Sequence, residues 1–402
     1  MRLLKNLFSR LSDSLLVSVP SRIRAARDFA SAPVLRLVSS KPDAPVGDNA
    51  KRAPSHTTGQ QEALEEAIRK SQAWFLGRQD ASEGFWVAEL EADTTLSSEY
   101  LMLRRFMNCV DPERERKVIR YLKSAQLPCG GWPIYHGGPA DISASVKAYF
   151  ALKLSGVSAA EPFMVHARTC ILDKGGVPAA NVFTKIALAL FGQYNWRGVP
   201  SMPPEIMLLP KRFYFSIYAI SYWSRAVLIP LLIIFAKRPQ CDVPPEQGID
   251  ELYTQPPAEI DYSTVLPFKK DRTWFTARNF FINLDALLKV YDRSPVEWVR
   301  QKALKCAENW MLDHMKGSGG LGAIYPAMAN SVMMYDTLGY APSHPDRAIA
   351  RTSVEKLLVI KDHEAYCQPC VSPIWGRGSA GRAGGSRRGR PARAGTRRGG
   401  GR

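Results

Sequence analysis

The sequence predicts an all-α fold built from antiparallel helix pairs. Amphipathic helical stretches recur, each followed by a glutamine, a glycine turn and a tryptophan. A unit repeated at a period of roughly 20 to 50 residues is typical of stacked supersecondary elements. Helix start and stop signals are dense from about Gln60 onward, and no stretch alternates convincingly enough to be a half-buried strand.

The clearest repeat runs from Ile119 to Trp132, and an earlier copy lies 47 positions before it. We expect the glycines to stop the helix by adopting positive φ. The glutamine amide is expected to bond backbone groups left open at the helix end, with the indole folded back over that amide. An ordinary buried turn is the alternative for either copy alone. The repeat-motif residues are Gln79, Gly84, Trp86, Gln126, Gly130 and Trp132.

A third, weaker copy is expected at residues 295–325. Its helix is predicted from Pro295 to Met315 and is followed by a glycine cluster. His314 stands where the other copies have glutamine, and the terminal tryptophan is missing. This copy therefore keeps the helix and the turn without the polar contacts.

Capping residues predict where several helices begin. Asp111 before Pro112 indicates one start, and Asp141 opens a second helix that ends at Gly156. Ser-x-x-Glu patterns beginning at Ser158 and Ser294 predict two capping boxes.

The most apolar part of the chain spans residues 207–239. Within it, residues 226–236 form an apolar run flanked by Arg225 and Lys237. As a helix the run rises only about 16 Å, roughly half the hydrocarbon thickness, so it is too short to span a membrane. A buried core helix and a helix lying in one leaflet both fit, and the aromatic residues at 213–223 favour an interface or an aromatic-lined cavity. The residues expected to contact a membrane are Leu228, Leu232 and Phe235.

The net charge of +17 is concentrated at the two ends of the chain. Residues 1–52 carry ten basic and four acidic side chains, and residues 376–402 carry nine arginines and no acid, which leaves about +2 for residues 53–375. The central part therefore gives no signal for a nucleic-acid partner. Residues 1–52 fit an amphipathic surface helix with a disordered continuation, and the glycine- and arginine-rich tail is expected to be disordered.

Seven cysteines at no regular spacing suit a reducing compartment better than a disulfide framework. Cys367 and Cys370 have the spacing of metal ligands, and His363 lies nearby. Because no second pair follows, ordinary buried or loop cysteines are the favoured interpretation, and we predict no metal site.

Several motifs together carry a family resemblance. Besides the repeats, they are Gly-Gly-Pro-Ala-Asp-Ile-Ser-Ala-Ser-Val-Lys-Ala-Tyr-Phe-Ala-Leu-Lys at 137–153, Pro-Pro-Glu-Ile-Met-Leu-Leu-Pro-Lys at 203–211 and Ser-Tyr-Trp-Ser-Arg-Ala at 221–226. From about Ala63 to Trp375 the chain resembles the squalene–hopene cyclases. The resemblance implies two α/α-barrel (toroid) domains, the second largely missing here, and a reaction that uses no cofactor.

The resemblance also implies a division of the chain. It gives a basic extension at 1–59, a strut and first helix of the catalytic barrel at 60–90, the N-terminal barrel at 91–365 with a membrane-facing segment at 207–239, the start of the catalytic barrel at 366–375 and the tail at 376–402. The tail is then best explained as a shifted reading of GC-rich coding sequence.

The family mechanism begins with protonation of a terminal squalene double bond by a strong acid in an Asp-x-Asp-Asp motif. Ring closures through carbocations, stabilised by aromatic faces, then give hopene or hopanol in hopanoid triterpenoid biosynthesis. The motif does not occur in the 402 residues, and Gly376 stands where the family has an aspartate. We therefore assign no catalytic residue and expect the chain to be inactive as a cyclase. The resemblance assigns substrate-cavity positions to Trp223, Ile324, Tyr325, Pro326 and Trp375.

Four acids near the family's early helices are Glu89, Glu91, Asp93 and Glu99. Solvated or helix-capping roles are favoured for them. Lys147 stands where some family members carry an acid, so a matching position does not ensure a matching role.

The partners implied by the resemblance are squalene and a membrane surface. It implies monotopic attachment, at the cytoplasmic face of a bacterial membrane, and it allows a homodimer; no nucleic acid is expected. The alternative is a non-catalytic lipid-binding or membrane-docking module. A third hypothesis is RNA binding through the arginine tail.

Overall fold

A computed structural model of the chain describes residues 58–79, 89–262, 270–273, 276–315 and 320–370. The chain divides into two compact units, residues 1–88 with 373–402 and residues 89–372. The described helix of the first unit is α3 (Thr58–Leu76). The guanidinium of Arg78, two residues beyond the helix, lies 3.9 Å from the centre of the Trp74 ring. Gly84, Trp86, Trp375 and almost all of both predicted terminal extensions lie outside the described residues.

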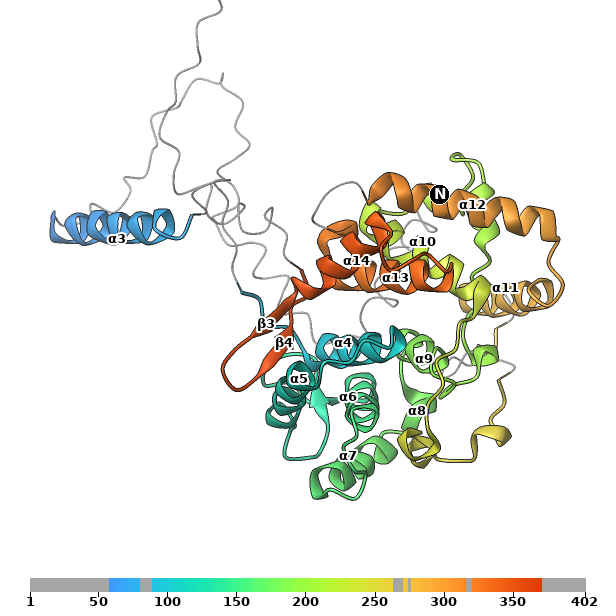
Figure 1. Ribbon diagram of the computed structural model, residues 1–402, viewed down its shortest axis with the longest axis horizontal. Coiled ribbons are helices and arrows are strands. Elements are labelled where there is room, and N and C mark those ends of the chain that lie inside the picture. The colour runs from blue at the N-terminus through green and yellow to red at the C-terminus, as the bar shows by residue number, and fades with distance from the viewer. Residues whose placement is uncertain (1–57, 80–88, 263–269, 274–275, 316–319, 371–402) are drawn as a thin grey trace, which may run out of the picture. The chain divides into compact units, whose positions relative to one another are not determined.

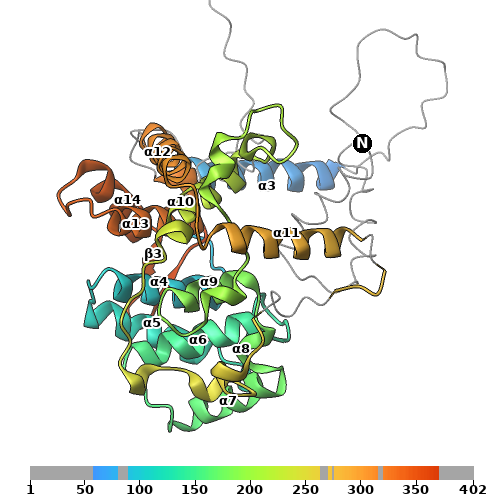
Figure 2. The same cartoon turned by 90° about the vertical axis from the view of Figure 1, so that its right-hand side faces the viewer.

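The second unit is built from helices, which confirms the predicted all-α class. Figure 1 shows α4 to α9 gathered in one half of the unit and α10 and α12 to α14 in the other, and the perpendicular view in Figure 2 agrees. The helices are α4 (Thr94–Phe106), α5 (Pro112–Ser124), α6 (Ile142–Leu154), α7 (Pro162–Asp173), α8 (Gly176–Ala179), α9 (Val182–Ala189), α10 (Tyr222–Lys237), α11 (Ala277–Tyr291), α12 (Glu297–His314), α13 (Tyr325–Thr337) and α14 (Pro345–Glu355).

Helix packing within the unit follows a simple order. Helix α4 packs on α5 and α6, and α6 on α7 and α8. In the other half α10 packs on α12 and α13, and α13 on α14. Helix α13 also contacts α4, so the two halves share one apolar core.

Two short antiparallel hairpins differ from the prediction that the chain has no strand. They pair β1 (Trp132–Pro133) with β2 (Ala140–Asp141), and β3 (Leu358–Ile360) with β4 (Ala365–Cys367). Strands of two or three residues are too short to show an alternating pattern in the sequence. The first hairpin connects α5 to α6 and the second follows α14, and neither forms a sheet layer.

Two of the predicted helix starts are confirmed. Asp111 caps α5 by accepting hydrogen bonds from the backbone N–H groups of Glu113 and Arg114, each at 3.2 Å. Asp141 caps α6 in the same way, with donor distances of 2.8 and 2.9 Å. These caps could be read from sequence because all their partners lie within one helical turn.

The two predicted capping boxes are wrong. Helix α7 begins three residues later than predicted, with Glu161 at the cap position and Pro162 setting the first helical φ, while Ser158 Oγ accepts from the N–H of Ala160. Helix α12 begins at Glu297 without a side-chain cap. Ser294 is instead part of the turn that closes α11, because its N–H donates to the carbonyl of Tyr291 at 3.1 Å.

The Ile119–Trp132 repeat forms a clasp, defined here as Gln126, Gly130 and Trp132 with their partners. The Trp132 indole is fully buried, and its Nε1–H donates to the carbonyl of Leu122 at 2.7 Å. The Gln126 amide donates to the carbonyl of Gly130 at 2.6 Å and to that of Phe163, on α7, at 3.0 Å.

The hydrogen bonds of Gln126 and Trp132 thus differ from those predicted. It is the indole that satisfies an open carbonyl in the last turn of α5. The glutamine instead closes the turn and reaches the next helix.

Gly130 is the position in the clasp where only glycine fits. Its φ is +89°, a left-handed conformation that L side chains rarely adopt. A Cβ there would also lie 2.5 Å from the carbonyl oxygen of His166 on α7. The turn can therefore approach α7 closely enough for Gln126 to bond it.

The weaker third copy keeps its helix and replaces the polar contacts by stacking. His314 lies on Trp310 with ring centroids 3.9 Å apart, and its Nδ1 is 2.8 Å from the carbonyl of Trp310. Residues 316–319 of the glycine cluster lie outside the described residues.

We expect Trp132→Phe to lower the free energy of unfolding by about 2 kcal/mol. The substitution keeps most of the apolar volume but leaves the buried Leu122 carbonyl without its donor. Trp298→Phe is the matched control, because that indole is 72% exposed. Urea unfolding followed by circular dichroism measures both variants, and equal midpoints for the two would contradict the role given to the indole.

Candidate functional site

The candidate site is a junction between segments far apart in the sequence. We name as the junction cluster the residues where 365–370 meets α4, α5 and the start of α13. The Tyr325 N–H donates to the carbonyl of Pro369 at 2.8 Å, and the Cys367 N–H donates to Ser97 Oγ at 3.1 Å. The Leu90 N–H donates to Gln368 Oε1 at 2.8 Å. These bonds join the first and last described parts of the second unit.

Three of the five residues that the resemblance places in a cavity belong to this junction. Ile324 forms an isolated antiparallel bridge with Cys370, Tyr325 is fully buried and Pro326 is half-buried. A Cβ at Gly322, in the preceding loop, would lie 3.3 Å from Ala226 Cβ on α10.

Trp223 lies one helical turn before Ala226 on α10, and its side chain is 41% exposed. The structure therefore places Trp223 and the 320–326 loop on adjoining elements. Trp375, the fifth position, lies outside the described residues.

An ion pair lies near the junction cluster, since Glu99 acts electrostatically on both Tyr325 and Cys367. Lys147 Nζ, on α6, contacts a carboxylate oxygen of Glu99, on α4, and the lysine side chain is only 4% exposed. Burial, and after it the negative charge of Glu99, raises the pKa of the Tyr325 hydroxyl well above its ordinary value. Within the described part of the chain that hydroxyl has no hydrogen-bond partner. A buried hydroxyl in this state is available to a water molecule or a bound ligand.

None of the four early acids has the properties of a proton donor to an alkene. Asp93 caps α4 by accepting from the Thr95 N–H at 2.8 Å, and burial raises its pKa, which makes it a weaker acid than usual. Glu99 is paired with Lys147, and Glu89 with Lys361 at 3.3 Å on the surface. Glu91 is exposed and interacts with the Tyr121 hydroxyl. These are capping, pairing and solvated roles, as the residue pattern favours.

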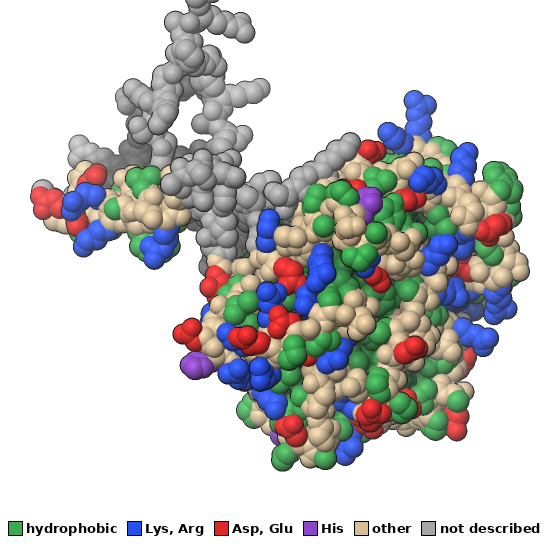
Figure 3. Space-filling model, in the orientation of Figure 1, with side chains coloured by type: hydrophobic (Ala, Val, Ile, Leu, Met, Phe, Trp, Pro, Cys, Tyr) green, Lys and Arg blue, Asp and Glu red, His purple; other side chains and the backbone are tan. Residues whose placement is uncertain are grey.

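Exposed aromatic and cationic side chains lie in the segment before α10 and in its first turn, and we name them the aromatic surface. Its aromatic rings are between 37% and 48% exposed. Lys211 Nζ and the Arg225 guanidinium lie 5.4 and 5.9 Å from the centre of the Tyr218 ring. Figure 3 shows that hydrophobic, basic and acidic side chains are interspersed over the face of the molecule turned toward the viewer. The rings are Phe213, Tyr214, Tyr218, Tyr222 and Trp223.

Helix α10 itself is a core helix, which corrects the predicted membrane contacts. Leu232 is 2% exposed and Phe235 is 8% exposed, and the Phe235 ring packs edge-on against Trp196 at 5.5 Å. Leu228 is half-buried. The reason is that α10 packs against both α12 and α13, which cover its apolar sides. Among the described helices, none has the length and hydropathy needed to cross a bilayer.

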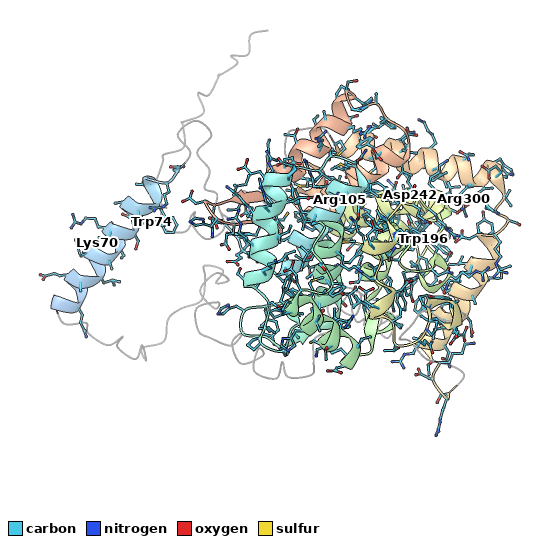
Figure 4. The ribbon with its side chains drawn as sticks, turned by 60° about the horizontal axis from the view of Figure 1, so that its bottom comes forward. Lys70, Trp74, Arg105, Trp196, Asp242 and Arg300 are labelled. Atoms are coloured by element: carbon cyan, nitrogen blue, oxygen red, sulfur yellow. The ribbon has the colours of Figure 1, made fainter. Side chains whose placement is uncertain are left out.

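A partly buried charge network fixes the segment before α10 to α11 and α12. Arg300, labelled in Figure 4, donates to Glu205 Oε1 at 2.6 Å and to Asp292 Oδ1 at 2.8 Å. Tyr291 donates to the same Glu205 oxygen at 2.9 Å. The network therefore fixes the 204–208 segment to the end of α11 and the start of α12. Sequence reasoning missed it, because the partners are up to 95 positions apart.

Lys185, on α9, is a fully buried amine that the sequence gave no reason to single out. Its Nζ donates to the carbonyl of Pro178 at 2.8 Å and lies 5.6 Å from the centre of the Tyr194 ring. Burial lowers the pKa of Lys185 to about 7. Burial disfavours the charged form because it removes the ammonium group from water.

The described residues contain no group of three or more His, Cys, Asp or Glu side chains placed to hold a metal ion. Cys367 is buried, and its thiol lies 3.7 Å from the carbonyl oxygen of Gln368. Cys370 is half-buried and makes the backbone bridge to Ile324.

Comparison with known proteins gives a consistent result. Residues 68–363 match the family model described as the squalene-hopene cyclase N-terminal domain. The chain is 45% identical to a squalene–hopene cyclase of Bradyrhizobium diazoefficiens over 82% of this chain and 49% of that protein. It is 44% identical to the squalene–hopene cyclase of Zymomonas mobilis, over 78% of this chain and 47% of that protein. The dammaradiene synthase of Dryopteris crassirhizoma is 36% identical to the chain, over 78% of this chain and 44% of that protein. The chain thus spans about half the length of the curated relatives it matches.

We expect Lys185 to make stability depend on pH between about 7 and 10. In the unfolded chain the amine holds its proton up to pH ~10.5, whereas in the folded chain it loses it near pH 7. Stability therefore rises with pH in this window, and the penalty is fully present below about pH 7. Lys185→Met should flatten the dependence, so that wild type gains about 2 kcal/mol relative to the variant between pH 7.5 and 9.5. Parallel curves for the two proteins in chemical unfolding would contradict this.

Proposed function

The chain belongs to the squalene–hopene cyclase family, and from this premise we propose that its second unit is the N-terminal barrel of a squalene cyclase. In this role it docks on a membrane and borders the path of an apolar triterpene. The observation that carries the proposal is the match of residues 68–363 to the family's N-terminal domain. The reaction it serves is the cyclisation of squalene to hopene or hopanol.

The proposed contribution of this chain is positioning rather than protonation. An alkene is a very weak base, so its protonation needs an acid stronger than an ordinary carboxyl group. Asp93 is a weaker acid than usual, and Glu99 is held by Lys147. We therefore propose that these 402 residues, taken alone, do not cyclise squalene.

The substrate side of the proposal rests on the junction cluster. Ile324 and Pro326 are half-buried beside the buried Tyr325, and Trp223 is exposed on the adjoining helix. An apolar chain is recognised by burial of its surface, and an aromatic face such as that of Trp223 stabilises a nearby cation. These residues are the ones we assign to the edge of a squalene path.

The membrane side of the proposal rests on the aromatic surface. Aromatic side chains with neighbouring lysine and arginine residues are enriched where proteins meet lipid headgroups. Its five rings are exposed, whereas most of α10 beyond its first turn is buried. We propose that this surface attaches the protein, as a monotopic or peripheral protein, to the cytoplasmic face of a bacterial membrane. A non-catalytic lipid-docking module would use the same surface.

We expect the purified 402-residue chain to give no hopene or hopanol from detergent-dispersed squalene. The reason is that the sequence contains no Asp-x-Asp-Asp motif, that Asp93 is a helix cap with a raised pKa and that Glu99 is paired with Lys147. Gas chromatography with mass detection measures the products, with a full-length squalene–hopene cyclase as the positive control. Product formation above the no-protein blank would overturn the inactivity while leaving the family assignment intact.

We expect the chain to co-sediment with vesicles that contain anionic lipid. Replacing Phe213, Tyr214 and Trp223 together by serine should lower the partition coefficient about tenfold, equivalent to ~1.4 kcal/mol. Trp298→Ser is the control, since that exposed indole lies on α12 outside the aromatic surface.

Circular dichroism must first show that the triple variant keeps its helix content. Unchanged sedimentation of the folded variant, or none for wild type, would contradict membrane docking through this surface.

A further inference from the structure

Two cysteine side chains meet beside the clasp. Cys129 lies in the turn between Gln126 and Trp132 and is exposed, whereas Cys170 lies on α7 and is 8% exposed. The two thiols are close enough to interact, because after burial the neighbouring Cys129 also raises the pKa of the Cys170 thiol. A Cβ placed on Gly131 would lie 2.9 Å from Cys170 Sγ, which shows how closely this sulfur approaches the turn.

Hydrogen bonds close the turn that carries Cys129 and join it to α7, which carries Cys170. The turn is closed by bonds from the Gly130 N–H to the Leu127 carbonyl at 2.8 Å and from the Leu127 N–H to the Gly131 carbonyl at 2.9 Å. Gln126 ties the turn to α7 through the Phe163 carbonyl. A disulfide needs its two Cα atoms within about 7 Å, and the backbone of the turn at Gly130 and Gly131 approaches α7 closely at His166 and Cys170. Here the fold keeps them together before any oxidation.

We propose that Cys129 and Cys170 form a reversible disulfide that locks the turn of the clasp to α7. The oxidant is a low-molecular-weight disulfide, such as oxidised glutathione. The Cys129 thiolate attacks one of its sulfurs, forming a mixed disulfide and releasing one thiol. Cys170 then loses its proton to solvent and attacks Cys129 Sγ, which releases the second thiol. The protein loses two electrons and two protons, and the small disulfide gains them.

The order of the two steps follows from exposure. Cys129 is open to solvent, so a small disulfide reaches it first. Burial raises the pKa of the Cys170 thiol, which keeps it protonated until the mixed disulfide lies beside it. Cys170 is therefore the resolving thiol.

The proposed disulfide would raise the stability of the fold and strengthen the attachment of the turn to α7. A bond between positions 129 and 170 closes a loop that contains all of α6, and such a cross-link restricts the unfolded chain. It would also add a covalent tie to the hydrogen bond by which Gln126 joins the turn to α7.

The test uses the full chain, reduced and then incubated with oxidised glutathione. Thiols are counted after denaturation, and digests are analysed by mass spectrometry without reduction. We expect two of the seven thiols to disappear, a cross-linked peptide pair containing Cys129 and Cys170, and a rise in thermal midpoint of several degrees that dithiothreitol reverses.

Variants distinguish the disulfide from general thiol oxidation. Cys170→Ser should retain glutathione on Cys129, Cys129→Ser should form neither product, and the control Cys241→Ser should still lose two thiols. If Cys170→Ser does not fold, Cys170→Ala takes its place. Glutathione that remains on Cys129 in wild type, or a Cys170 that stays fully alkylatable after oxidation, would overturn the proposal.

Discussion

The hydrogen bond from the Trp132 indole to the Leu122 carbonyl is the contact on which the first half of the helical unit depends. A helix must find partners for its last carbonyl groups, and where the helix end is buried, side chains of the protein can supply them. The Trp132 indole supplies one partner, and the backbone N–H of Trp132 donates to Ser145 Oγ on α6. Gln126 extends the same turn to α7. One turn therefore connects three successive helices.

Partly buried charges join α14 to α4 and α5. Glu355, on α14, accepts from Tyr100 and Arg104 of α4 and from Arg114 of α5. Such networks stabilise little beyond what their desolvation costs, but removing one member leaves a buried charge unpaired. They therefore specify which helix faces meet. This accounts for the closure of the C-terminal segment over α4, where the junction cluster forms.

The unit separates two properties that a cyclase must combine. Its apolar positions and exposed rings can guide and hold a triterpene, whereas its acids are occupied in capping and pairing. A carboxyl group that serves a helix cap or an ion pair is not free to act as a strong acid. Squalene handling without protonation is therefore the role that we propose for this unit.

The sequence by itself determined the helix starts at Asp111 and Asp141, the all-α class and the family, because caps and repeat motifs depend on residues close together in the chain. Only the tertiary structure decided that Leu232 is a core residue, that the Trp132 indole rather than the glutamine bonds the helix end, and that Cys129 meets Cys170. Each of these depends on which distant element packs alongside. An apolar run has the same composition whether its cover is lipid or another helix, so burial cannot be read from the run alone.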